Sequence, residues 1–158
     1  MSTTTAAQVD VRGPRFVAWI TTAVLVSTLI TSALSTSAAA VILGAQAVVF
    51  AIGAIAGPKR HPYGLIFARF VAPRLGPVQD REPVPPLKFA QLVGLFFAVV
   101  GVAGFATGAL YVGVVATGAA LVAALLNAAF GICLGCQIYP LVVRLRPAQH
   151  ASKAAETA

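Results

Sequence analysis

The chain has 158 residues, of which 59% are hydrophobic and only 9% are charged. Because an ordinary soluble domain carries about a quarter charged residues, this composition excludes a disordered chain, a disulfide-rich scaffold and a typical cytosolic domain. It indicates a small polytopic membrane protein. The formal net charge of +7 is explained below by membrane topology, so we expect no nucleic-acid partner.

Four long apolar segments occur in the sequence, and none contains Asp, Glu, Lys, Arg or His. Each is close to the ~20 residues that a helix needs to cross the hydrocarbon core of a bilayer. We expect the four spans near residues 16–34, 38–57, 89–107 and 110–130. The first is rich in Ser and Thr, whose hydroxyls a helix absorbs by bonding them to its own carbonyls.

The connections between these segments differ in length. Residues 35–37 form a short polar turn, and residues 108–109 separate the last two segments by only two small residues. Residues 58–88 form a long loop rich in proline and basic residues. The predicted fold is all-α, a bundle of four transmembrane helices arranged as two hairpins within a single membrane domain over residues 1–146. We expect the polar residues 1–10 and the tail at 147–158 to be disordered.

All 11 basic residues lie on one side of this four-span topology. They precede the first span, lie in the long loop or follow the last span: Arg12, Arg15, Lys59, Arg60, Arg69, Arg74, Arg81, Lys88, Arg144, Arg146 and Lys153. Because basic loops stay in the cytoplasm, we expect a multi-pass protein of the plasma (inner) membrane with both termini cytoplasmic. A cleavable signal peptide is the alternative for the first segment, but its removal would leave three spans.

The central cytoplasmic loop contains a segment too short to cross the bilayer. Residues 62–71 combine aromatic and aliphatic side chains with neighbouring arginines, which is typical of a short interfacial helix. The prolines of residues 83–86 predict a stiff extended arm leading into the third span. Asp80 and Glu82 flank Arg81, and we interpret this pattern as solvated local ion pairing.

Three amide side chains, Gln46, Gln91 and Asn127, lie inside the apolar segments. We expect each to face another helix, because an unpaired amide in hydrocarbon is costly. Glycines at helical spacing predict close packing of the spans, and an oligomer interface or a substrate lining is the alternative.

A C-L-G-C sequence follows the fourth span and contains both cysteines of the chain, Cys133 and Cys136. At the cytoplasmic membrane surface a permanent structural disulfide is not expected. The flanking glycines favour a fresh helix that starts near residue 137 with Pro140 in its first turn. Cys136 would then lie at a helix N-terminus, where free N–H groups favour the thiolate form.

Three interpretations of the cysteine pair are open at this point. In the first, Cys136 is an exposed nucleophile and Cys133 the resolving thiol of a redox or sulfur-relay pair, with Asn127 and Gln137 orienting them. In the second, both are small buried residues that pack at a helix end. In the third, they bind a soft metal such as Cu(I), and His61 is the one additional ligand. Otherwise no cofactor is expected.

Five segments carry a family resemblance: DVRGPRF at 10–16, PYG at 62–64, PRLGP at 73–77, KFAQ at 88–91 and LNAAFGICLGC at 126–136. With these motifs, the chain from about residue 9 to residue 146 resembles domain-of-unknown-function family 4395, a family of actinobacterial integral membrane proteins. The resemblance implies a membrane protein without an assigned activity. Since members often accompany thioredoxin-like or sulfurtransferase proteins, it also implies such a partner. Residues 138–140, IYP, depart from the helical segment that the family leads us to expect.

The leading functional hypothesis is therefore thiol redox or sulfur relay at the cytoplasmic membrane face, through Cys133 and Cys136. The alternative is a non-catalytic subunit or scaffold of a larger membrane complex. A facilitator for a neutral solute is third, since no span holds an ionisable residue for proton coupling. A conventional enzyme is not expected, because there is neither a phosphate-binding glycine loop with Lys nor an intramembrane carboxylate.

Overall fold

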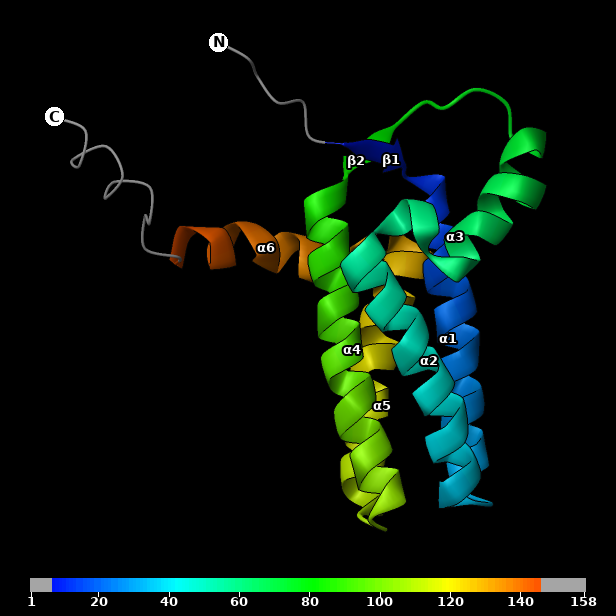
Figure 1. Ribbon diagram of the computed structural model, residues 1–158, viewed down its shortest axis with the longest axis vertical. Helices are drawn as coiled ribbons and strands as arrows, with labels where there is room; N and C mark the ends of the chain where they lie inside the picture. Colours follow the sequence, from blue (N-terminus) through cyan, green and yellow to red (C-terminus); the bar gives the residue numbers. More distant parts are fainter. Residues whose placement is uncertain (1–6, 146–158) are drawn as a thin grey trace, which may run out of the picture.

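The computed structural model describes residues 7–145 of the chain. Four long helices dominate it: α1 (Arg12–Ser32), α2 (Thr36–Ala56), α4 (Val84–Ala106) and α5 (Leu110–Leu125), which continues into a π-helical turn, η4 (Leu126–Phe130). Figure 1 shows them as an elongated bundle. All four are long and apolar enough to cross a membrane, so the predicted all-α fold with four candidate spans is confirmed.

The ends of the helices follow from local chemistry. The Ser35 hydroxyl accepts a hydrogen bond from the Ala38 N–H at 3.2 Å and so caps the start of α2. Gly57, with φ of 79°, ends the same helix in a conformation that favours glycine. In the hydroxyl-rich α1, Ser27 and Thr28 donate to carbonyls one turn earlier at 2.9 Å, as expected for a span of this composition.

The four helices pack as a closed ring. Short turns join α1 to α2 and α4 to α5, but the most extensive packing is between α2 and α4, and α1 also packs against α5. Glycine permits the close approach of α4 to α5, since a Cβ at Gly104 would lie 2.5 Å from the backbone nitrogen of Gly113. The division into two hairpins therefore stays a prediction.

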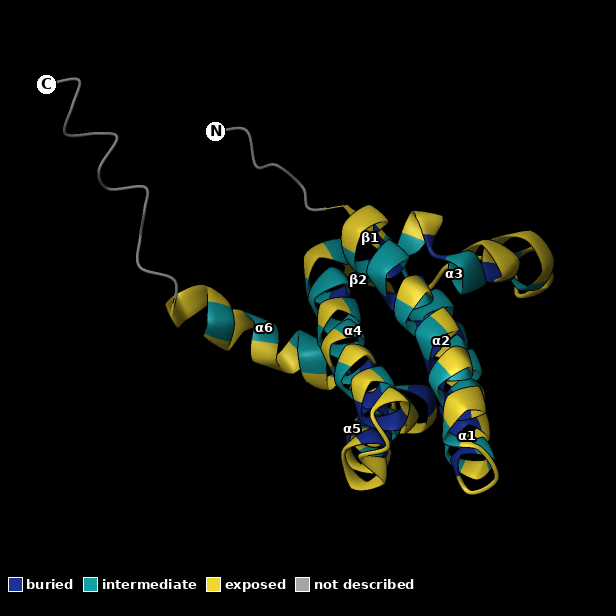
Figure 2. Cartoon of the chain, turned by 60° about the horizontal axis from the view of Figure 1, so that its bottom comes forward, coloured by how far each residue is buried: buried dark blue, intermediate teal, exposed yellow. Residues whose placement is uncertain are grey.

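The distribution of apolar side chains fits a membrane protein. Figure 2 shows buried residues between the helices and exposed residues on their outer faces. The core includes Leu25, Leu43, Phe50, Ala98 and Phe105. Large apolar side chains also cover the outer faces, among them Ile30, Val41, Ile55, Phe96 and Val115. An exposed apolar surface of this extent is expected where lipid surrounds the helices.

The end of the bundle that carries the long loop holds two short strands that the sequence did not predict. β1 (Gln8–Asp10) pairs antiparallel with β2 (Arg81–Pro83), with Val9 opposite Glu82. The prediction of disorder is therefore wrong for residues 8–10, because the two strands satisfy each other's backbone groups. Residues 1–6 and the predicted tail at 147–158 lie outside the described residues.

Arg12 ties the N-terminal strand to the long loop. Its guanidinium forms an ion pair with Asp10 at 2.8 Å and donates to the carbonyl oxygens of Leu75, Gly76 and Pro77 at 2.8 to 3.4 Å. The hydrogen bond from Arg12 lowers the pKa of the Asp10 carboxyl. Within residues 7–145 this is the one ion pair. The predicted ion pairing of Arg81 with Asp80 and Glu82 is thus wrong. Arg81 lies in β2 opposite Asp10 of β1, and consecutive side chains of a strand point to opposite faces.

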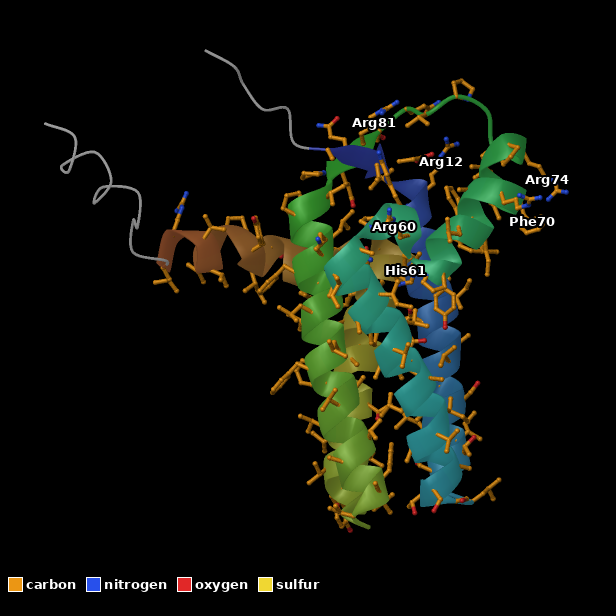
Figure 3. The ribbon with its side chains drawn as sticks, in the orientation of Figure 1. Arg12, Arg60, His61, Phe70, Arg74 and Arg81 are labelled. Atoms are coloured by element: carbon orange, nitrogen blue, oxygen red, sulfur yellow. A yellow bond between two sulfur atoms is a disulfide. The ribbon has the colours of Figure 1, made fainter. Side chains whose placement is uncertain are left out.

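The rest of the long loop consists of short helical turns: η1 (Pro58–Arg60), α3 (Pro62–Ile66), η2 (Phe67–Val71) and η3 (Ala72–Arg74). Phe67 is buried, with its ring 5.6 Å from that of Phe16. Leu65, Ile66 and Phe70 are exposed, and Figure 3 shows Phe70 and Arg74 at the outer edge of this segment. The helical conformation agrees with the predicted interfacial helix, and its location at a membrane surface stays a prediction.

Candidate functional site at the loop end of the bundle

A cavity of about 760 Å³ lies at the loop end of the bundle. All four long helices, the two strands, the loop turns and α6 (Leu134–Leu145) contribute to its wall. Most of the wall is apolar, and the polar or charged residues in it are Gln8, Asp10, Thr21, Lys59, His61, Arg81, Gln91, Asn127 and Cys133. The fold thus brings three of the predicted site residues, His61, Asn127 and Cys133, to one cavity. Cys136 does not line it.

His61 is the most deeply buried polar residue of the cavity wall, with 2% of its surface exposed. It lies between η1 and α3, at the loop end of the bundle in Figure 3. Neither ring nitrogen has a hydrogen-bond partner among the described residues. Burial lowers the pKa of His61, and the adjacent Gln91 side chain offsets part of this shift. The imidazole is therefore neutral at physiological pH.

Gly53 of α2 makes room for His61 and for Gln91 of α4. A Cβ at Gly53 would lie 2.6 Å from Cδ2 of His61 and 2.9 Å from Oε1 of Gln91. This amide oxygen is also buried without a partner in the part of the chain that the structure describes. Two side chains with unused hydrogen-bonding capacity therefore adjoin each other at the cavity.

A second polar contact lies beside His61. The Tyr63 hydroxyl donates a 2.9 Å hydrogen bond to Oε1 of Gln46, and the rings of His61 and Tyr63 meet edge to face with centroids 5.4 Å apart. Burial raises the pKa of Tyr63, which keeps its hydroxyl protonated as a donor. The sequence predicted that Gln46 faces another helix, and its partner Tyr63 lies on α3. The PYG motif at 62–64 was the available signal for this contact.

The C-L-G-C sequence begins α6, which leaves the bundle sideways (Figure 1). The predicted fresh start near residue 137, with Pro140 in the first turn, is wrong: α6 begins at Leu134 and Pro140 lies inside it. Cys133 explains the earlier start, because its sulfur accepts the Cys136 N–H at 3.3 Å and its carbonyl accepts the Gln137 N–H at 3.1 Å. Cys133, rather than Cys136, therefore occupies the capping position.

The two cysteines lie at disulfide-bonding distance, with Cα atoms 5.2 Å apart, and both are half-buried. No cysteine is free in the described chain. Neither Asn127 nor Gln137 makes a side-chain hydrogen bond to either sulfur within residues 7–145, so their orienting role stays a prediction. The same residues contain no group of three potential metal ligands, and His61 does not form such a group with the two cysteines.

Close packing against α4 fixes the position of α6. A Cβ at Gly135 would lie 2.6 Å from Cα of Ala90, and the rings of Tyr139 and Phe89 lie 6.0 Å apart. Farther along α6, Ile138, Leu141 and Leu145 are exposed. Gly135, between the two cysteines, therefore permits the close contact of α6 with α4, which the sequence did not predict.

The fold defines a class of protein: a helical protein with four candidate membrane spans and a cysteine pair beside a cavity at one end. The family described as Domain of unknown function (DUF4395) matches residues 9–144, and the chain belongs to this family. The resemblance seen in the sequence motifs is thereby confirmed, and the protein is an integral membrane protein of unknown function. No curated protein and no solved structure matches the chain.

Proposed function

We propose that the protein is a thiol–disulfide exchange protein with Cys133 and Cys136 as its reactive pair. The observation that carries the proposal is their position, since two sulfurs at bonding distance begin α6 beside a largely apolar cavity. Disulfide exchange needs two thiols that can reach each other. A sulfur relay needs only one free thiol, so the pairing favours exchange.

The proposed reaction starts with a dithiol protein of the thioredoxin-like class. One thiolate of this partner attacks the sulfur of Cys136, and the sulfur of Cys133 leaves as a thiolate. The Cys136 N–H and the N-terminal end of α6 stabilise that charge. The second partner thiolate then attacks the mixed disulfide and releases Cys136. The partner loses two electrons and two protons, and Cys133 and Cys136 gain them as two thiols.

We further propose that the protein resides in the plasma (inner) membrane with the loop end, and hence both termini, on the cytoplasmic side. The support is the distribution of charge. The described basic residues lie in the long loop, in α6, or near the loop-side starts of α1 and α4: Arg12, Arg15, Lys59, Arg60, Arg69, Arg74, Arg81, Lys88 and Arg144. The two turns at the other end contain none. Loops that carry Lys and Arg remain cytoplasmic.

Redox titration of the purified protein tests the exchange function. We would equilibrate the protein in detergent with glutathione buffers of graded potential and count free thiols by alkylation. We expect one two-electron transition under native conditions. Cys133→Ser should accumulate a glutathione mixed disulfide at Cys136, because the resolving sulfur is gone, whereas wild type should not.

Cys136→Ser is the matched control, since it retains the sulfur at the capping position and removes its neighbour. We expect less mixed disulfide in this variant than in Cys133→Ser. Cysteines that react only after denaturation would contradict the exchange function. That result would indicate a packing role and favour a non-catalytic subunit.

A further inference from the structure

The cavity combines an apolar wall with buried polar groups whose hydrogen-bonding capacity is not used up within residues 7–145. Val17, Phe50 and Phe97 contribute apolar surface. His61 and Gln91 adjoin each other but form no well-placed hydrogen bond within the described residues. Their mutual contact, which offsets part of the lowered pKa of His61, can satisfy only one of the two ring nitrogens. Buried polar atoms without partners are rare, because they lose hydrogen bonds to water and gain nothing in exchange. Their position on a cavity wall points to a ligand that supplies the missing bonds.

The chemistry of these groups limits the ligand. A neutral imidazole offers one donor and one acceptor, and the amide oxygen offers an acceptor. The charged residues of the wall, Asp10, Lys59 and Arg81, come only from the loop-side elements, and Asp10 is already paired with Arg12. The interior therefore suits a neutral, apolar ring that bears carbonyl or hydroxyl oxygens.

The volume of the cavity also fits such a ligand, since pockets for small molecules typically measure about 300–1,000 Å³. Ala119, Ala120 and Ala123 belong to the wall on α5, where small side chains leave space for an apolar tail. Cys133 belongs to the same wall. A ligand in this cavity therefore shares it with one residue of the reactive pair.

We propose that this cavity binds a membrane-soluble quinone, which hydrogen-bonds to His61 and Gln91 and reoxidises the dithiol of Cys133 and Cys136. The redox step rests on the proposed exchange function, whereas the binding site stands on the cavity and its unpaired groups. The quinone supplies the two-electron acceptor that repeated oxidation of a partner dithiol requires.

The electrons and protons of the step balance. The thiolate of Cys133 adds to a ring carbon of the quinone and forms a carbon–sulfur bond. The thiolate of Cys136 then attacks the Cys133 sulfur, the carbon–sulfur bond breaks, and its electron pair stays on the ring. The two protons released by the thiols go to the two ring oxygens. The products are one disulfide and one hydroquinone.

Binding can be measured apart from redox chemistry. The probe is a fully substituted benzoquinone with a decyl tail, and the protein is the Cys133→Ser, Cys136→Ser double variant in lipid nanodiscs. We expect saturable binding to this variant. Adding His61→Phe or Gln91→Leu should raise the dissociation constant at least tenfold. Gln46→Leu, which removes a buried amide that does not line the cavity, should leave it within twofold.

Ala123→Phe provides an independent test if the His61 variant fails to fold, because it fills the cavity from α5 and should also abolish binding. Decanol, which has the same tail without the ring, should not compete. Absence of quinone binding, or equal competition by decanol, would overturn the quinone site. A wild-type protein that exchanges thiols with glutathione but binds no quinone would overturn this inference alone. Quinone binding to the wild-type dithiol without its oxidation would overturn the redox step, and only the failure of thiol exchange with glutathione would overturn the proposed function.

Discussion

At the scale of single residues, Gly53 determines whether α2 can adjoin His61 and Gln91. We expect Gly53→Ala to lower the free energy of unfolding by about 1–3 kcal/mol, because an added methyl group forces packed neighbours to shift. Gly44→Ala in the same helix is the control, since a Cβ there meets nothing within 4 Å. Its higher helix propensity should raise stability by up to about 1 kcal/mol. Thermal unfolding of both variants in one detergent measures the contrast, and equal effects would contradict it.

His61 makes stability depend on pH. Because burial lowers its pKa from the ordinary 6.5, the unfolded chain binds a proton at pH values where the folded protein does not. The stability contributed by the neutral imidazole is thus present above pH 6.5 and is lost as pH falls through the lowered folded pKa.

We expect acidification from about pH 8 to about pH 5 to destabilise wild type more than His61→Gln, as measured by the free energy of unfolding at each pH. Glu82→Gln is an informative control. Burial raises the pKa of Glu82, so its contribution is present at low pH and is lost as pH rises through its folded pKa. Removing Glu82 should therefore steepen the acid destabilisation. An identical pH profile for wild type and His61→Gln would refute the assignment.

At the scale of elements, Arg12 holds the two strands and the long loop together. Arg12→Ala removes the pair with Asp10 and the hydrogen bonds to residues 75–77. We expect limited proteolysis to cleave the loop several-fold faster in this variant, because cleavage requires a free, extended backbone. Arg74→Ala is the matched control, since within residues 7–145 the Arg74 side chain bonds only to a carbonyl four residues earlier, that of Phe70, at 2.6 Å. Equal cleavage rates in the two variants would contradict the role of Arg12.

The four long helices could be predicted from the sequence because apolar length alone identifies a candidate span. The strands could not, since each has three residues and forms only by pairing with a segment far along the chain. The predicted start of α6 is wrong for a local reason: Pro140 disfavours helix, but the helix already begins at Leu134, where the Cys133 sulfur accepts the Cys136 N–H. The glycine and proline residues therefore predict correctly that the helix is interrupted after the fourth span. They do not predict the residue at which the next helix begins.

At the scale of the whole molecule, the cavity arises from residues that the sequence keeps apart. His61 and Cys133 were each candidates, but nothing in the sequence indicated that the loop turn, α4 and α6 meet around one apolar space. The sequence predicts that Gln91 faces another helix, but its position next to His61 becomes apparent only in three dimensions. Such sites depend on the packing of helices, which local patterns do not encode.

The proposed function requires a four-span protein that exposes its cysteine pair to the cytoplasm. A membrane-impermeant maleimide, applied to intact and to lysed cells after mild reduction with a permeant phosphine, tests this directly. The turn at Ser35 lies at the opposite end of the bundle from Cys133, so a Ser35→Cys variant lacking Cys133 and Cys136 reports the other side.

We predict that the native cysteines react only after lysis, whereas Cys introduced in place of Ser35 reacts in intact cells. Labelling of Cys133 or Cys136 from outside, together with protection of the introduced cysteine, would contradict the orientation. It would also remove the cytoplasmic dithiol partner from the proposed function.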